Sequence, residues 1–150
     1  MGILSNKGLT FIELMIVIVI MGIMASIVNS DYKVYMNKRR LNGTAVVVML
    51  DLMLARAQAI SMNRDVRVIF PRSASGQYTY DADGNSQTKN IQTNLGYYDV
   101  TLVADNDPIF SSRGIARNAA ATNPVATVTL SNPAGSKTVT VNIAGQVQMN

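Results

Sequence analysis

Glu13 is the residue whose type and surroundings most clearly point to chemistry. It is the one charged residue in the run 9–28, which is otherwise apolar or small except for Thr10. A carboxylate at the centre of a membrane costs roughly 3 kcal/mol, and less near the end of a span. An acid in apolar surroundings is tolerated when a cation neutralises it, so we expect Glu13 to meet a positive charge when such helices pack together. Its place at the start of a helix also suits the positive end of the helix dipole.

Enzyme chemistry has little support elsewhere in the sequence. The chain of 150 residues contains no His and no Cys, which removes the commonest general base and any thiolate nucleophile. A serine nucleophile therefore lacks a His partner, and Lys89 and Lys137 lie in polar, loop-like sequence. No glycine-rich phosphate-binding motif is present. We expect a protein that is not an enzyme, with no catalytic residue and no cofactor.

Two segments rich in Asp contain oxygen atoms of the kind that bind Ca²⁺. The first is the segment 81–85, and the second contains Asp105 and Asp107 before Pro108. The first segment does not match the EF-hand loop and has no Glu at the twelfth position. We expect both segments to form turns, which favour Asp, Asn and Gly, and we expect no metal site. A calcium ion in these turns stays an open alternative.

The apolar run is long enough to span a membrane. A helix over residues 9–28 rises about 30 Å, which is the thickness of the hydrocarbon core. The following segment is amphipathic, with apolar or small residues at alternating spacings of four and three, which form one stripe on a helix. The stripe consists of Leu41, Ala45, Val48, Leu52, Ala55, Ala59 and Met62. No Pro occurs before Pro71, so we expect one helix from Leu9 to about Asn63, with its second half against a domain core.

Short segments rich in β-forming residues follow the helix and indicate a sheet. The expected strands are residues 66–70, 77–80, 97–103, 109–112, 126–130, 138–143 and 147–149. Turn residues separate them at 81–85 and 131–135, and residues 117–124 are typical of a loop. We expect an α+β fold in which the second half of the long helix packs on a C-terminal antiparallel sheet.

Three interpretations compete for the first thirty residues. One is an ordinary secretory signal, in which Lys7 precedes an apolar region that ends in the small residues Ala25 and Ser26. The second is a plain membrane anchor, and the third is the signal of a filament subunit. Glu13 favours the third, because neither a cleaved signal nor a plain anchor has a use for a carboxylate in its apolar segment.

Residues 7–15, followed by the apolar run, resemble the class III signal of type IV pilins and type II secretion pseudopilins. The resemblance implies that prepilin peptidase cleaves between Gly8 and Leu9 and that Leu9 is then N-methylated. It also implies that Glu13, as the fifth residue of the cleaved chain, is the assembly residue, which the α-amino group of a neighbouring subunit neutralises. Two positions depart from the family pattern, because Leu9 replaces the usual Phe and Ser30 replaces a common Pro. The helix is therefore expected to lack the usual kink or to melt differently on assembly.

The resemblance continues over nearly the whole chain and points to the GspH/FimT family of minor pseudopilins and minor pilins. The similar segments are the helix end and the strand after it at residues 51–70, and three pieces of the last hairpin at residues 128–132, 138–141 and 144–147. The resemblance implies the type IV pilin fold in three parts. These are a leader at residues 1–8, a transmembrane and filament-core half-helix at 9–30, and a periplasmic globular domain at 31–150.

The same resemblance implies a function and a set of partners. It describes a structural subunit of a type II secretion pseudopilus or a type IV pilus, held in the inner membrane by a single span before assembly. Its partners are the membrane, other pilins or pseudopilins, prepilin peptidase and the inner-membrane assembly platform. The resemblance does not separate secretion from piliation, or a minor from a major subunit.

A pilus-tip or minor pilin that binds DNA or a surface is the alternative function. Some FimT-type relatives take up DNA through a basic C-terminal segment, whereas residues 145–150 contain no Lys or Arg. Phosphate binding needs cations, and Lys38, Arg39 and Arg40 are the remaining candidates. We expect these three to face solvent or the filament, and we expect no nucleic-acid partner.

The residues that flank the apolar run bear on its orientation and packing. Lys7 precedes the run, while Lys33 and the basic residues 38–40 follow it, so the positive-inside rule alone would place the domain in the cytoplasm. The family resemblance implies the periplasm, and we follow the resemblance. The aromatic residues of the long helix, Phe11, Tyr32 and Tyr35, are expected to be packing groups.

Overall fold

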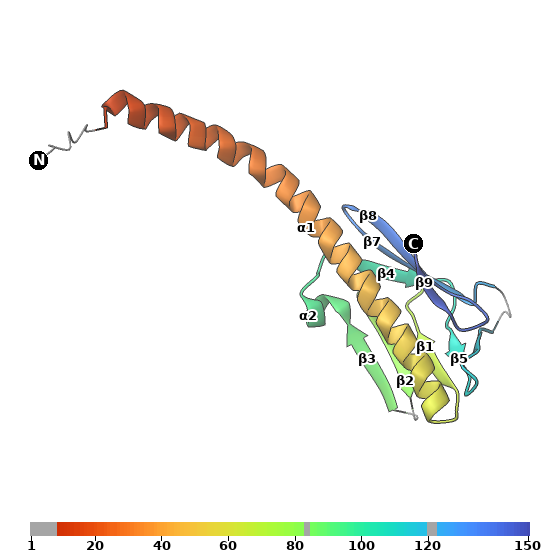
Figure 1. The fold of residues 1–150 in the computed structure, drawn as a ribbon. Helices are drawn as coiled ribbons and strands as arrows, with labels where there is room; N and C mark the ends of the chain where they lie inside the picture. The colour runs from red at the N-terminus through yellow and green to blue at the C-terminus, as the bar shows by residue number, and fades with distance from the viewer. Residues whose placement is uncertain (1–8, 83–84, 120–122) are drawn as a thin grey trace, which may run out of the picture. The chain divides into compact units, whose positions relative to one another are not determined.

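The chain forms a long helix followed by two antiparallel sheets (Figure 1). The structure is a computed structural model that describes residues 9–82, 85–119 and 123–150, without the side chains of residues 27–31, 82 and 85. Packing divides the chain into two compact units, Met1–Met36 and Asn37–Asn150. In its described part the first unit is almost entirely helix, whereas the second unit contains the rest of that helix and all the strands.

Helix α1 (Phe11–Ser61) confirms the long helix within two residues at each end. At its start the Thr10 hydroxyl accepts a hydrogen bond of 3.3 Å from the backbone N–H of Glu13, which caps the first turn. Just past its end Asn63 has a positive φ of 53°, a left-handed conformation in which helices commonly stop. The helix continues through Ser30, where the family often has Pro.

The described residues form nine strands in two sheets, whereas the sequence predicted one sheet. Sheet A has the strand order β3-β2-β1-β5-β6, and sheet B has the order β4-β7-β8-β9. The strands are β1 Val66–Ile69, β2 Gln77–Ala82, β3 Asn85–Asn90, β4 Thr101–Ala104, β5 Ile109–Phe110, β6 Ala116–Arg117, β7 Ala126–Asn132, β8 Gly135–Val141 and β9 Val147–Met149. A bridge between Ser75 and Leu102 connects β4 to the loop that leads into β2. The α+β fold class, with the long helix packed on antiparallel strands, is confirmed. The strands divide into two sheets because strand propensity is local, while the choice of which edges pair depends on tertiary contacts.

The region between β2 and β4 differs most from the predictions. Strand β3 and the short helix α2 (Ile91–Leu95) were not predicted. The Asn90 side chain caps α2 by accepting hydrogen bonds from the backbone N–H groups of its first turn. The predicted strand 97–103 is wrong in its first half, because Gly96 ends α2 with a φ of 69° and a turn closes between the Tyr97 carbonyl and the Val100 N–H at 3.2 Å.

Other element limits shift by a few residues. Asp81 lies in β2 and pairs with Ser86 of β3, so the turn predicted at 81–85 is narrower, and residues 83–84 lie outside the described residues. The turn predicted at 131–135 is also narrower, because β7 continues to Asn132 and β8 begins at Gly135. The predicted loop 117–124 begins inside β6, and its residues 120–122 lie outside the described part. The hairpin of β7 and β8 and the closing strand β9 are confirmed.

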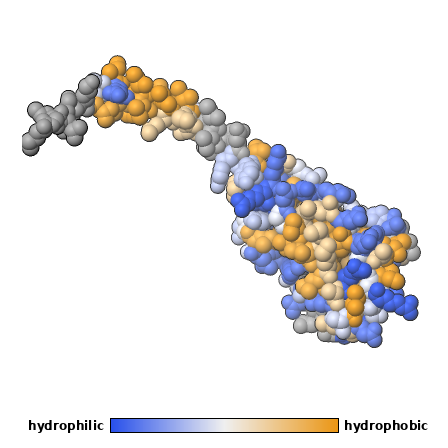
Figure 2. All heavy atoms as spheres, in the orientation of Figure 1, coloured by the Kyte–Doolittle hydropathy of each residue, from blue (hydrophilic) through white to orange (hydrophobic). Residues whose placement is uncertain are grey.

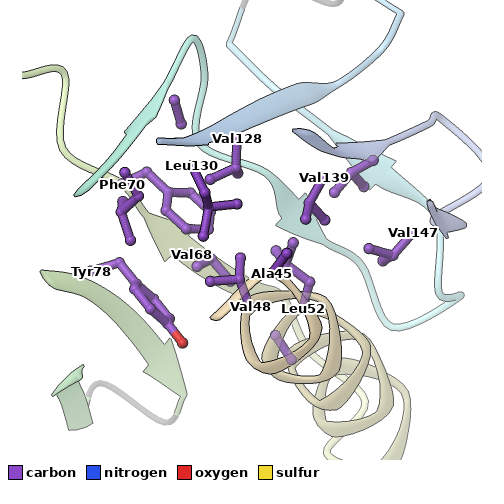
Figure 3. Packing of buried hydrophobic residues seen from close by; sticks show 14 of the residues in the cluster. Ala45, Val48, Leu52, Val68, Phe70, Tyr78, Val128, Leu130, Val139 and Val147 are labelled. Atoms are coloured by element: carbon purple, nitrogen blue, oxygen red, sulfur yellow. The ribbon is translucent and has the colours of Figure 1, made fainter. Parts of the chain in front are cut away.

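The core of the second unit lies between α1 and the inner faces of both sheets (Figure 3). Six members of the predicted helix stripe are buried, and only Met62, which lies past the end of α1, is exposed. The stripe combines branched residues such as Val48 and Leu52 with three alanines, and an alanine lets a helix approach a sheet closely. The facing residues are Val66, Val68, Leu102, Phe110, Val128, Leu130, Val139 and Val141.

Candidate assembly site

The first half of α1 is an apolar rod with no covering from its own unit. Every described side chain of residues 9–26 is exposed. On the face in view, Figure 2 shows this hydrophobic surface on the first part of the helix, with hydrophilic colouring near its start. Soluble monomers rarely expose a contiguous apolar surface of this extent, so a membrane or a partner protein must cover it.

Two parts of α1 are candidates for membrane contact by composition among the described residues, and one of them is long enough to span a membrane. The segment Tyr32–Ser61 is long and apolar enough, and Phe11–Ser26 is a shorter apolar stretch. The core stripe of the second unit, including Leu41, Val48 and Leu52, lies in the longer segment. That burial identifies the longer segment as the core helix of a folded domain. The fully exposed segment Phe11–Ser26 is therefore the better candidate for membrane contact.

Glu13 lies in the first turn of α1, as predicted. Its backbone N–H is held by Thr10, but within the described residues its carboxylate forms no hydrogen bond and no ion pair. The side chain is exposed on a surface formed by neighbours such as Phe11, Ile12 and Leu14. A carboxylate at the N-terminal end of a helix is favoured by the helix dipole, and here it remains available to an outside cation. Gly8 lies outside the described residues, so cleavage between Gly8 and Leu9 and methylation of Leu9 stay predictions.

The second half of α1 is attached to sheet A by a polar cluster that the sequence did not reveal. Asp51 of α1 accepts a hydrogen bond from the hydroxyl of Tyr78 on β2 and pairs with Lys89 Nζ of β3 at 2.5 Å. Burial raises the pKa of Tyr78 above its usual range, and the hydrogen bond and charge of Asp51 raise it further. Asp51 lies next to Leu52 of the buried stripe, and that adjacency was the one available signal.

Arg56 attaches the same helix to two turns of the sheets. Its Nε donates to the Gly114 carbonyl at 2.9 Å, and its guanidinium also reaches the Ala144 carbonyl at 3.4 Å. The backbones at Gly114 and Gly145 lie very close together here, because a Cβ on Gly145 would clash with the Gly114 carbonyl oxygen. This one side chain of α1 thereby connects the β5–β6 turn with the β8–β9 turn.

A groove of about 570 Å³ lies beside this contact, between the outer face of α1 and β9. Its lining consists of Met53, Arg56, Ala57, Ile60, Gly145, Gln146, Val147 and Gln148. The outer face of α1 in this unit also contains the exposed apolar residues Val46, Leu50 and Leu54. The groove and this face are suited to protein contact and contain no acid, His or Cys that would support catalysis.

Two of the carboxylates considered for calcium, those of Asp105 and Asp107, serve structural roles. Asp105 accepts a hydrogen bond of 2.7 Å from the backbone of Thr127, and Asp107 accepts one of 3.0 Å from the backbone of Phe70 while pairing with Arg72. In the described part of the chain, no group of three or more Asp, Glu, His or Cys residues is placed to hold a metal ion. Of the three basic residues considered for DNA binding, Arg40 already forms an ion pair within the domain, with Asp99 at 3.2 Å.

A helix with an exposed apolar first half and a second half packed on antiparallel sheets is the architecture of type IV pilin-like proteins. The sequence profile described as Type II transport protein GspH matches residues 44–145, and that of the prokaryotic N-terminal methylation motif matches residues 3–29. The chain belongs to the GspH family, as the sequence resemblance predicted.

Solved structures show the same fold. The type IV minor pilin FimU of Pseudomonas aeruginosa is 14% identical with a TM-score of 0.57, over 77% of this chain and 92% of FimU. The minor pseudopilin EpsH of the type 2 secretion system of Vibrio cholerae is 15% identical with a TM-score of 0.55, over 74% of this chain and 96% of EpsH. A comparison with curated protein sequences finds no match.

Proposed function

We propose that this member of the GspH family is a minor pseudopilin, a structural subunit that enters a filament through the first half of α1. The observation that supports the proposal is the exposed apolar rod at residues 9–26 with a free carboxylate in its first turn. The methylation motif covers the same region. Family and fold are those of structural pilins rather than of enzymes.

In the proposed maturation, prepilin peptidase removes residues 1–8 and Leu9 receives a methyl group. The new α-ammonium of one subunit then pairs with Glu13 of its neighbour in the filament core. Both charges would be costly if buried alone, and breaking a buried pair costs about 3–5 kcal/mol. The pairing therefore favours a subunit whose α-ammonium lies beside Glu13 of its neighbour over one that leaves either charge unpaired. Glu13 is in this sense the assembly residue.

The proposed location is the inner membrane, with residues 9–30 in the bilayer and the folded domain in the periplasm. The apolar first half of α1 and the methylation motif support membrane anchoring. The orientation rests on the family, since the basic residues after the span oppose it by the positive-inside rule. Prepilin peptidase and the inner-membrane assembly platform are the partners that this route requires.

A type II secretion pseudopilus is the filament that the family description supports, because the matched profile is that of a type II transport protein. The fold comparison gives no preference, because FimU and EpsH match with nearly equal TM-scores. Binding of DNA at a pilus tip is not favoured, because the C-terminal residues 145–150 lack any cation.

The direct test is the intact mass and N-terminal sequence of the full-length protein, recovered from membranes of cells that contain prepilin peptidase. We expect a chain that begins at N-methylated Leu9. A chain that begins near Ile27, or one that keeps residues 1–8, would contradict the proposal. A Gly8→Ala variant serves as the control, in which we expect the leader to remain.

A further inference from the structure

The aromatic residues of the first unit lie only at the two ends of its apolar rod. Phe11 lies at the start, Tyr32 and Tyr35 lie near the end, and residues 12–31 contain no aromatic side chain. All three rings are exposed, at 79%, 60% and 62%. They are therefore not packing groups within this chain, and the distribution needs another explanation.

The spacing of the rings matches the thickness of a bilayer. A helix rises 1.5 Å per residue, so Tyr32 lies about 32 Å along the axis from Phe11, compared with a hydrocarbon core of about 30 Å. Tyr and Trp are enriched at both membrane–water boundaries, where the ring faces the chains and the polar tip faces water. When Phe11 lies at one boundary, Tyr32 and Tyr35 lie at the other.

Lys33 lies between the two tyrosines and adds a positive charge at the same level. It is exposed, and in the described part of the unit neither it nor the two tyrosines form a hydrogen bond, an ion pair or a ring contact. A lysine at the end of a span extends its ammonium toward lipid phosphates while its methylene groups stay against the chains. A free ammonium flanked by two free phenols is well suited to a lipid headgroup.

We propose that Tyr32, Lys33 and Tyr35 form an interfacial anchor that binds the headgroups of anionic phospholipids on the side of the folded domain. The anchor rests on the proposed membrane insertion. It adds a lipid partner and defines the depth of the rod in the bilayer. Glu13 lies about 28 Å from Tyr32 along the axis, so the anchor holds the carboxylate at the opposite boundary, where a charge costs least.

The same geometry positions the predicted cleavage bond. Leu9 lies four residues before Glu13, so an anchored rod presents the Gly8–Leu9 bond at the opposite membrane surface. A rod free to slide by one helical turn would move this bond by about 5 Å, into lipid or away from the surface.

The test uses single-tryptophan variants of the full-length protein, because the chain contains no Trp. Tyr32→Trp and Tyr35→Trp report on the anchor, Val19→Trp on the middle of the rod, and Tyr98→Trp on an exposed position of the folded domain. Each variant is reconstituted, at a low protein-to-lipid ratio and without other pilins, into vesicles of phosphatidylcholine and phosphatidylglycerol. Lipids brominated either near the headgroup or deep in the chains quench the fluorescence by depth.

We expect the two anchor variants to be quenched most by the shallow label, Val19→Trp by the deep label, and Tyr98→Trp by neither. Anchor variants that behave like Tyr98→Trp, as they would if these rings contact only neighbouring subunits, would overturn the inference, as would anchor variants that behave like Val19→Trp. If Val19→Trp itself escapes quenching, the proposed membrane insertion fails, and the inference fails with it.

The charge is tested by adding Lys33→Gln to Tyr35→Trp. One cation near an anionic surface enriches anionic lipid about fivefold, so quenching by brominated phosphatidylglycerol should exceed that by brominated phosphatidylcholine. We expect this preference to weaken with Lys33→Gln, and to weaken again at high salt. An unchanged preference would show that Lys33 does not bind the headgroup.

Discussion

Gly145 should be far less tolerant of a side chain than Gly96, although both need the same backbone conformation. Their φ angles are 72° and 69°, so replacement by Ala places either residue in the left-handed region at a cost of about 1–2 kcal/mol. A Cβ on Gly96 would meet nothing within 4 Å. A Cβ on Gly145 would contact the carbonyl oxygen of Gly114 and lie 2.9 Å from Arg56 Nε.

The additional loss follows from the contacts around Arg56. Relieving the clash separates Gly114 from the turn at Gly145 and breaks the bond from Arg56 to the Gly114 carbonyl. A hydrogen bond to a charged group contributes about 1.5–3 kcal/mol. We therefore expect Gly145→Ala to lower the free energy of unfolding by about 2.5–5 kcal/mol, against about 1–2 kcal/mol for Gly96→Ala.

Urea unfolding of the full-length protein in detergent measures this difference. The near-ultraviolet circular dichroism of the tyrosines packed in the folded domain, Tyr78, Tyr80 and Tyr97, reports on that domain independently of the helical signal of the exposed rod. Equal losses for the two variants would refute the reasoning, because they would mean that the two turns are not held together through Arg56.

Three further predictions concern the two faces of α1 and the buried Tyr78. Leu52→Ala should lower the free energy of unfolding by about 2–5 kcal/mol, because Leu52 is 1% exposed, whereas Leu50→Ala at 53% exposure should cost less than about 1 kcal/mol in the same urea titration. Leu50→Ala should instead reduce the recovery of the subunit in filaments if the outer face of α1 contacts neighbours. The raised pKa of Tyr78 gives a contribution to stability that is complete below its ordinary value of about 10 and is lost as the pH rises above that value. Tyr78→Phe should remove this alkaline loss, while the exposed Tyr98→Phe should leave it unchanged.

The helix and its buried face could be predicted because their signals are local. The spacings of Leu41, Val48 and Leu52 repeat with the helical period, and six of the seven stripe residues are buried. The carboxylate of Glu13 was identified in the same way, by its contrast with the apolar run around it.

Strand β3 and the polar contacts of α1 could not be predicted, because they depend on distant partners. The segment Asn85–Asn90 has few β-forming residues, and its six-residue pairing with β2 makes it a strand. Asp51 meets a tyrosine 27 positions away, and Arg56 meets a carbonyl 58 positions away. Composition near either residue does not specify such a partner.

The central claim is that the free carboxylate of Glu13 directs assembly of the apolar rod. It is tested most directly by comparing Glu13→Gln with Leu14→Ala on the same turn, each carrying an epitope tag and co-expressed with wild-type partners. The measured quantity is the ratio of tagged subunit in sheared filaments to tagged, processed subunit in the membrane. We predict that Glu13→Gln remains in the membrane while Leu14→Ala enters filaments, whereas entry of Glu13→Gln at the wild-type ratio would contradict the account.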